Sequence, residues 1–394
     1  ATATPEASAV SAVEEPGAAG PVCTATTGFG VTCLGDAGWQ SFTEENSQLG
    51  SDYVTAVARC PDNQMLFAHL AGVSAWNGTD WSSYQSWGTG TGDVMACDAD
   101  GGIWVAHFQG VSHFADGAWT THGSDKLATG ASANELVNDV VVAPDGKVWV
   151  ATSQSVAMFD GTDWTVFQAG QGFDKQYFIS KLTVDRQDHV WAAYGDGLLE
   201  YDGAKWTAHP SSLYVTPQTV AADPQGRIWV GTLSDGIHVF DGKGWTQYDT
   251  EQSELSSNHG NAIVFDTQGR AWVGTAYGLD VWDGEAWQAY HMHTAELVDN
   301  DIAGIAVAGS GPPLPSLATK AAGSLVGRVV NADNTPLASA AVELCVEKLV
   351  SSFTGPTPCA DQPLVRQTTT DADGRFTVPD LPPGRYSVTM DTGN

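Results

Sequence analysis

Hydrophobic and polar residues alternate along most of this chain, in short runs that turn residues separate. Residues 146–164, GKVWVATSQSVAMFDGTDW, hold three such runs: Val148 to Thr152, Val156 to Phe159, and one that starts at Trp164 after an Asp-Gly turn. Such alternation is typical of β-strands with one buried face. Similar copies lie at 102–119, 188–206, 226–245 and 269–287. The pattern predicts repeated antiparallel units.

Tryptophans mark the period of this repeat. A further apolar run precedes each copy, so each unit has four strands, which we name A (the preceding run), B, C and D in chain order. A period of about 40 residues with four strands per unit is the signature of a β-propeller. The D-strand tryptophans lie 38 to 45 residues apart, at Trp39, Trp81, Trp119, Trp164, Trp206, Trp245 and Trp287. The predicted A strands are Val94 to Cys97, Val137 to Ala143, Leu182 to Asp185, Thr219 to Asp223 and Ala262 to Asp266.

The two ends of the repeat region supply the parts of one more unit. Residues 301–307 form a candidate A strand, and residues 21–39 overlay on a set of B, C and D strands. We therefore predict an all-β protein in which residues 21–308 are a seven-bladed β-propeller, closed by strands from both ends. Such closure removes the free sheet edges that expose a β protein to aggregation.

The charge of the chain limits its partners. Lysine and arginine number 16 against 46 aspartates and glutamates, a formal net charge of −30. Nucleic acids and anionic membrane surfaces require positive patches, so we expect neither as a partner. No apolar run approaches the roughly 18 residues of a membrane helix. The first residues, ATATPEASA, resemble the mature end left by secretory cleavage, which predicts an extracellular or cell-surface protein.

Six cysteines fit that compartment. Cys23 and Cys33 fall on adjacent strands of the composite blade and are expected to form a disulfide. Cys345 and Cys359 are expected to form a second, which closes a loop near the C-terminus. Cys60 and Cys97 end A strands in neighbouring blades, and they are either a third disulfide or buried thiols. No spacing resembles a zinc or haem site, so we predict no metal and no cofactor.

The ends of the B strands give a candidate ligand site. Turns alternate between the two faces of a propeller, so the residue three after the B-strand tryptophan lies at one face in every blade. We predict these residues as a ligand-binding ring for a sugar or a peptide; the alternative is that they hydrogen-bond the strand ends. The residues are His69, His107, Thr152, Tyr194, Thr232 and Thr275, with Thr26 at the same position in the composite blade.

Catalysis is less favoured by the residues. Two histidines without a third partner are weak evidence for a metal. Propeller lyases that act on lactone antibiotics use a histidine and a metal on one face, and His69, His107 and His259 are the candidates for such chemistry here. The repeated Asp-Gly elements are interpreted as turn formers, since aspartate caps its own turn and glycine takes positive φ. We therefore predict no catalytic residues and a non-enzymatic protein.

Two family resemblances follow from these motifs. The runs GRIWVGTLSDGIHVFDG and GRAWVGTAYGLDVWDG resemble the repeats of sensor propellers in bacterial two-component regulators. Residues 323–391 resemble the carboxypeptidase regulatory-like, or transthyretin-like, β-sandwich, through the segments 327–329, 336–337, 370–374 and 381–386. The first resemblance implies a propeller and the second a non-catalytic module common in secreted proteins.

The regions outside the propeller suggest how the protein acts. Residues 1–20 are predicted as a flexible tail and 309–322 as a Pro/Gly/Ala linker, followed by a sandwich at 323–394 that stops where its family usually continues with one or two strands. We therefore predict a secreted structural or adhesive filament subunit, in which residues 1–20 of one copy complete the sandwich of the next. The alternatives are an extracellular ligand-binding, sensor-like propeller and, less favoured, a propeller lyase.

Overall fold

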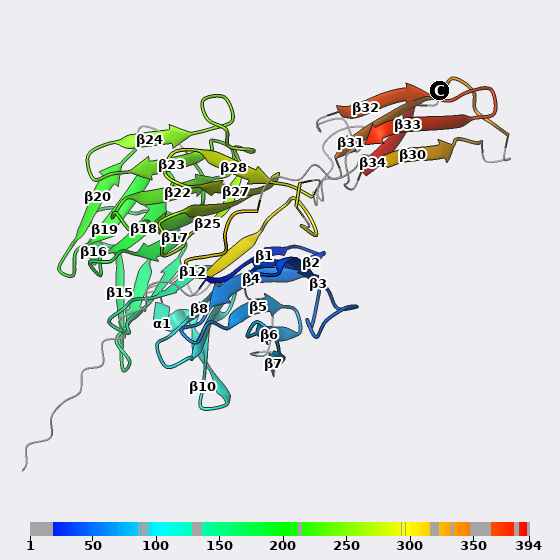
Figure 1. Cartoon of the computed structure of the whole chain (residues 1–394). Helices are drawn as coiled ribbons and strands as arrows, with labels where there is room; N and C mark the ends of the chain where they lie inside the picture. The colour runs from blue at the N-terminus through cyan, green and yellow to red at the C-terminus, as the bar shows by residue number, and fades with distance from the viewer. Residues whose placement is uncertain are drawn as a thin grey trace, which may run out of the picture.

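The computed structural model confirms the all-β prediction (Figure 1). It describes residues 19–85, 87, 92, 94–127, 136–211, 215–292, 294–295, 297–315, 323–331, 335–346, 364–381 and 386–391. The helix α1 (Ser124–Leu127) is a single turn. Among the described residues there is no helix long and apolar enough to cross a membrane. The strands form seven sheets of four or five strands and two smaller sheets near the C-terminus.

Six of the seven larger sheets are continuous in sequence. Blade 2 holds β4 (Val54–Arg59), β5 (Met65–His69), β6 (Gly72–Trp76) and β7 (Trp81–Gln85); blade 3 holds β8 (Val94–Cys97), β9 (Ile103–His107), β10 (Gly110–Ala115) and β11 (Ala118–Gly123); blade 4 holds β12 (Val137–Val142), β13 (Val148–Thr152), β14 (Val156–Phe159), β15 (Trp164–Ala169) and β16 (Gly172–Phe173). Blade 5 holds β17 (Ile179–Val184), β18 (Val190–Tyr194), β19 (Gly197–Tyr201) and β20 (Trp206–Pro210); blade 6 holds β21 (Pro217–Ala222), β22 (Ile228–Thr232), β23 (Ile237–Phe240) and β24 (Trp245–Tyr248); blade 7 holds β25 (Gly260–Phe265), β26 (Ala271–Thr275), β27 (Gly278–Trp282) and β28 (Trp287–Tyr290).

Blade 1 joins the two ends of the ring, as predicted. It holds β29 (Gly304–Gly309), β1 (Ala19–Thr26), β2 (Gly30–Gly35) and β3 (Gly38–Phe42), in that order. In Figure 1 the blue β1 lies beside the yellow strand that ends the ring, and in the register of this pair Cys23 faces Ala306. The A strands of all seven blades line one central channel, a cavity of about 680 Å³.

Successive strands of a blade run in opposite directions, so the connections fall on two faces of the ring. The B–C turns and the D–A loops share one face, which we call the loop face. The A–B and C–D turns share the other, which we call the turn face. Every A strand therefore begins at the loop face, at one mouth of the channel.

An aspartate after the A strand fixes the A–B turn in four blades. In blade 7 the Oδ1 atom of Asp266 accepts the backbone amides of Gln268 and Arg270, each at 3.0 Å. Its Oδ2 atom accepts the Trp272 indole N–H at 3.0 Å and Arg270 Nε at 2.6 Å. A buried carboxylate must find such donors, and here they link the turn to the B strand. Asp98 with Trp104, Asp185 with Trp191 and Asp223 with Trp229 repeat the bond.

The Asp-Gly elements act as turn formers, which agrees with the sequence interpretation. In blade 5 the Oδ1 atom of Asp202 accepts the backbone amides of Ala204 and Lys205, each at 2.9 Å, and these bonds lower the pKa of the Asp202 carboxyl. Hydrogen bonds that stabilise the ionised form of an acid have this effect. The same arrangement holds Asp160, Asp241 and Asp283.

Two disulfides are present among the described residues. Cys23 and Cys33 are bonded across the β1–β2 hairpin, as predicted, with Cα atoms 4.0 Å apart. Cys60 and Cys97, for which the sequence left two alternatives open, are also bonded, with Cα atoms 5.1 Å apart. This second bond joins blades 2 and 3. Cys359 lies outside the described residues, so its pairing with Cys345 stays a prediction.

The A strands of blades 5 to 7 begin earlier than predicted because each contains a β-bulge near its start. In blade 5 the register shifts between Ile179 and Lys181, whereas the predicted strand begins at Leu182. The extra residue breaks the alternation that the prediction used. It also serves packing between blades: at the bulge of blade 4 Asn138 donates its side-chain N–H to the carbonyl of Ile179 in blade 5, at 2.7 Å.

The segment after the ring begins at Ser310, since Gly309, where the linker was predicted to begin, is the last residue of β29, and this segment packs on blade 7. Arg270 donates through Nη2 to the carbonyl oxygens of Ser310 and Pro312, at 2.7 and 3.0 Å. The Tyr290 hydroxyl donates to the carbonyl of Pro315 at 3.0 Å. Residues 310–315 are therefore held by side chains of the propeller.

Residues 323–391 form the two smaller sheets, with the five strands that the sequence predicts. One sheet pairs β30 (Gly323–Arg328) with β33 (Arg375–Leu381); the other places β31 (Ala341–Val346) between β32 (Leu364–Thr369) and β34 (Tyr386–Asp391). Val342, Leu344 and Val378 form the buried core between them. A side chain at Gly327 would meet the Phe376 ring at 2.4 Å, so glycine is required for this packing.

Replacing Asp266 by alanine is expected to destabilise the propeller by about 3 kcal/mol, because it leaves the buried Trp272 indole and Arg270 without their acceptor. Urea unfolding of the full chain measures the change. Asp283→Ala is the control: this exposed aspartate accepts two backbone amides only, and its loss should cost about 1 kcal/mol. Equal losses in the two variants would contradict the coupling of turn and tryptophan.

Candidate functional site

The predicted ligand ring lies at the loop face, but its side chains are buried. Each residue ends a B strand, and their exposed fractions range from 0 to 6%. They are spaced round the ring, one to a blade, so no single opening gathers them. The residues concerned are Thr26, His69, His107, Thr152, Tyr194, Thr232 and Thr275.

Six of the seven residues bond within their own B–C hairpin, and Tyr194 instead packs its ring against that of Tyr177. His69 Nε2 contacts Ser74 Oγ at 2.9 Å, and His107 Nε2 contacts Ser112 Oγ at 2.8 Å. The Thr232 hydroxyl donates to the carbonyl of Gly236 at 2.9 Å. Burial lowers the pKa of both histidines, which favours their neutral form. The geometry thus gives six of these residues the hairpin-closing role that was the alternative interpretation, and ligand binding by the ring stays a prediction.

A second polar position, on the C strand, was missed by the sequence reasoning. The side-chain oxygen at this position accepts a backbone amide from the D–A loop that follows the preceding blade. Ser74 Oγ accepts the backbone amide of Gly50 at 3.0 Å, and Thr32 Oγ1 accepts that of Val298 at 3.0 Å. The available signal was a single polar residue inside an otherwise apolar C strand. This position anchors the loops that form the loop face.

Blade 7 carries a carboxylic acid at this position. Asp280 is fully buried; Ser256 donates its hydroxyl to Asp280 Oδ2 at 2.5 Å and its amide to Oδ1 at 3.3 Å. The Ser256 hydroxyl also contacts Thr275 Oγ1 at 3.2 Å. Burial raises the pKa of Asp280 to about 7, while the hydrogen bonds from Ser256 and Thr275 oppose part of that shift. Asp280 is therefore the titrating group of a loop anchor.

The channel is lined by polar as well as apolar side chains. Asp139 and Lys181, from the A strands of blades 4 and 5, lie in its wall. Asp139 accepts the backbone amide of Leu182 at 2.7 Å, and Lys181 donates to the carbonyl of Asn138 at 3.2 Å. Burial raises the pKa of Asp139, although Lys181 and the two amide bonds act in the opposite direction. These charged groups thus hold adjacent blades together across the channel wall.

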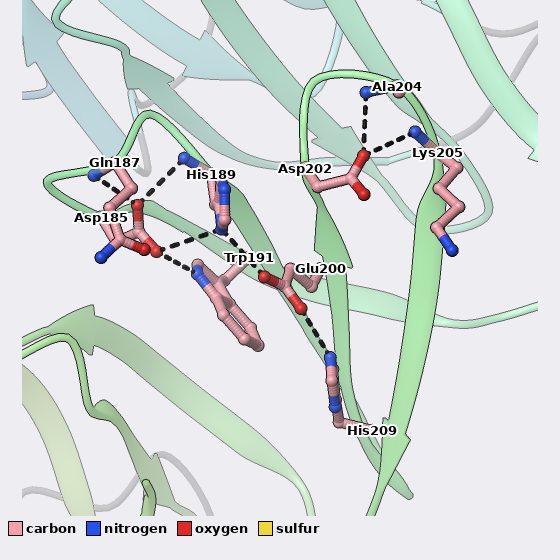
Figure 2. Close-up of polar contacts among 9 residues, drawn as sticks. All are labelled: Asp185, Gln187, His189, Trp191, Glu200, Asp202, Ala204, Lys205 and His209. Atoms are coloured by element: carbon pink, nitrogen blue, oxygen red, sulfur yellow. Dashed lines mark hydrogen bonds and ion pairs between the residues drawn. The ribbon is translucent and has the colours of Figure 1, made fainter. Parts of the chain in front are cut away.

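A row of histidine and acidic side chains crosses neighbouring strands of blade 5 (Figure 2). Glu200 lies between His189 and His209, at 2.9 and 2.8 Å, and His189 also approaches Asp185 at 3.7 Å. The His209 ring lies 5.4 Å from that of Trp191, next to blade 6. Among the residues that the structure describes, no group of three histidine, cysteine or acidic side chains is placed to hold a metal ion. Contacts between these side chains link neighbouring strands of blade 5.

Asp280 gives the loop anchor a dependence on pH that an amide would lack. Its folded pKa, about 7, lies above the ordinary value of 3.8, so its stabilising contribution is present at acid pH and is lost as pH rises through about 7. Relative to Asp280→Asn, the wild-type free energy of unfolding should fall by up to about 1.4 kcal/mol per pH unit as pH rises from the ordinary pKa of 3.8 to about 7. Urea unfolding of both proteins at several pH values measures this difference. A difference that stays constant with pH would contradict the buried acid.

Comparisons with known proteins agree with both parts of the fold. Residues 324–393 match the carboxypeptidase regulatory-like domain family. No curated protein sequence matches the chain. The extracellular domain of a putative hybrid two component system from B. thetaiotaomicron is similar in structure, with a TM-score of 0.53 and 16% identity over 67% of this chain and 38% of that chain. This chain therefore spans well under half of that sensor domain.

Two lyases share the propeller. Catalytically inactive virginiamycin B lyase from Staphylococcus aureus, with quinupristin, has a TM-score of 0.52 and 11% identity, over 61% of this chain and 84% of that chain. A streptogramin B lyase has a TM-score of 0.50 and 12% identity, over 65% and 91%. Identities this low establish the fold alone. The chain thus combines a seven-bladed β-propeller with a C-terminal carboxypeptidase regulatory-like domain.

Proposed function

We propose that this protein is a secreted, non-enzymatic structural or adhesive subunit that assembles head to tail. In this assembly the predicted tail of one copy, residues 1–20, adds a β-strand to the C-terminal sandwich of the next copy, beside β34. The added strand comes from the residues before Ala19, because Ala19 and Gly20 belong to β1. Because donor and acceptor lie on different parts of the chain, such a contact leads to a ring or an open filament.

The observation that carries the proposal is an uncovered part of the sandwich core. Val342 and Leu344 in β31 are fully buried, and their partners in β34 are Met390 and Val388. Paired residues of neighbouring strands point to the same face of a sheet. Met390 and Val388 therefore point toward the core side, yet they are 50% and 37% exposed. A strand added beside β34 would bury both side chains.

The edge of β34 supplies the other half of the interaction. Among the described residues of the three-stranded sheet, β34 pairs with β31 on one side only, and we propose that its second side forms a further ladder of backbone hydrogen bonds. Exposed edges of this kind accept extended segments in strand addition. Residues 1–18 precede the described part of β1 and could reach about 60 Å when extended. Within them Ser8 to Val13 has the small and apolar residues that a narrow acceptor site would admit.

Several features support an extracellular, non-catalytic role. The two disulfides fit an oxidising compartment. The sensor domain with the similar propeller is extracellular. Two of the three candidates for lyase chemistry, His69 and His107, are 3% and 1% exposed and bonded to serines, whereas the third, His259, is half-buried. An extracellular ligand-binding propeller remains the second candidate function, and the surface that would serve it is described in the next subsection.

Deleting residues 1–18 is expected to abolish assembly while the propeller stays folded, since β1 begins at Ala19. Sedimentation and electron microscopy of wild type and deletion variant measure the assembly, and circular dichroism checks the fold. A synthetic peptide of residues 1–20, added to the deletion variant, should bind to it. The same peptide should bind at least about tenfold more weakly when Met390 is replaced by glutamate, because a charge would be buried.

Val326→Glu is the matched control. Val326 is 68% exposed in β30 of the other sheet, and it should tolerate the charge without loss of peptide binding. A wild-type protein that remains monomeric at high concentration, or a peptide that binds the Met390→Glu variant as tightly as the wild type, would contradict the proposal.

A further inference from the structure

We propose that the loop face of the propeller is a docking surface for a basic peptide segment with apolar side chains. The surface consists of an arc of exposed apolar residues on blades 2 to 6 at the channel mouth, which we call the apolar crown, and of the exposed carboxylates in the surrounding loops. This inference goes beyond the proposed assembly, which uses the sandwich and not the propeller.

The crown contains the exposed large hydrophobic side chains of the propeller. Their exposed fractions run from 45 to 71%, far above those of the core residues beside them. The crown residues are Tyr53 (45%), Leu70 (62%), Phe108 (54%), Leu136 (59%), Phe178 (71%) and Leu233 (45%).

These six residues occupy two equivalent positions of the blades. Tyr53, Leu136 and Phe178 each lie one residue before an A strand, at the start of β4, β12 and β17. The other three each lie one residue after a B strand, at the end of β5, β9 and β22. The two positions adjoin within a blade, as the hydrogen bond from Ser153 N to Leu136 O shows for blade 4. Because A strands line the channel, the crown lies along the part of its mouth that blades 2 to 6 form.

The distribution of these side chains is one-sided. Among the described residues of the ring, the large hydrophobic side chains with substantial exposure all lie at the loop face. The turn face presents A–B and C–D turns whose aspartates bond backbone amides. Scattered exposed apolar residues are normal, but their concentration at one face marks an interaction site.

The charge of the loop face selects the partner. In the described D–A loops and B–C turns, the lysines are Lys126 and Lys175, and these loops hold no arginine. Exposed carboxylates are more numerous: Glu44, Glu45, Asp125, Asp174, Glu251 and Glu254. A nucleic acid or an anionic membrane would be repelled by this surface, and so would a second copy of a chain with net charge −30.

A basic peptide with leucine or aromatic side chains satisfies both features. Its apolar groups would bury the crown, and its lysine or arginine side chains would pair with the rim carboxylates. Protein interfaces commonly combine an apolar centre with a polar, charged rim. An oligosaccharide would instead leave Leu70, Leu136 and Leu233 without apolar contacts, so the crown favours a peptide.

Fluorescence anisotropy with the full-length protein tests this. The probe is a labelled synthetic peptide in which lysine and phenylalanine alternate. Two control peptides have the same length: in one lysine alternates with serine, and in the other glutamate alternates with phenylalanine. The lysine–phenylalanine peptide is expected to bind at least about tenfold more tightly than either, and more weakly as salt is raised. Equal binding of the glutamate–phenylalanine peptide would overturn the choice of a basic partner.

Variants then locate the binding surface. The double variant Leu136→Ser, Phe178→Ser should weaken binding of the lysine–phenylalanine peptide at least about tenfold. Leu70→Ser, Phe108→Ser is a second double variant on other blades, and thermal unfolding checks that both fold. Val326→Ser, on the sandwich, is the control and should bind as the wild type does. Unchanged binding in both crown variants, or an equal loss in the control, would overturn the proposal.

Discussion

The contact between adjacent blades, centred on the B-strand tryptophan, is the interaction on which the ring depends. Trp229 and Trp272 are completely buried, and each packs against the following blade. A buried indole N–H without an acceptor costs free energy, so the burial of Trp229 and Trp272 favours an acceptor beside each of them. The aspartate at the A–B turn supplies that acceptor. Turn geometry, strand pairing and blade packing are therefore linked through one carboxylate.

Where this aspartate is absent, other groups act at the same place. In blade 2 the position is occupied by Cys60, whose disulfide to Cys97 joins blades 2 and 3 covalently. In blade 7 the linkage extends beyond the ring, since Arg270 contacts both Asp266 and the carbonyl of Ser310. The seam between blades is thus reinforced by different chemistry along the chain. Pairing of β29 with β1 in blade 1 joins the two ends of the ring in one sheet.

The two exposed surfaces differ in what they can bind. At the C-terminal sheet, the edge of β34 offers backbone groups and two apolar side chains, Val388 and Met390, which suits an extended segment of small residues. At the loop face, the apolar crown is surrounded by carboxylates, which suits a basic partner. We propose the first surface for self-assembly and the second for recognition of another molecule. A secreted subunit that both assembles and binds would use the two surfaces separately.

The sequence by itself determined the elements that local patterns encode. Alternation and turn chemistry predicted the blades, the composite blade 1, the Cys23–Cys33 bond across one hairpin and the five strands of the sandwich. Only the tertiary structure decided the features that depend on contacts between blades: the Cys60–Cys97 bond, the bulge at Asn138, the loop anchor at Asp280 and the burial of His69 and His107. A period of two residues specifies which side chains share a face of a strand, but not which surface will cover that face. For the same reason the apolar crown became visible only when the exposure of each side chain in the closed ring was known.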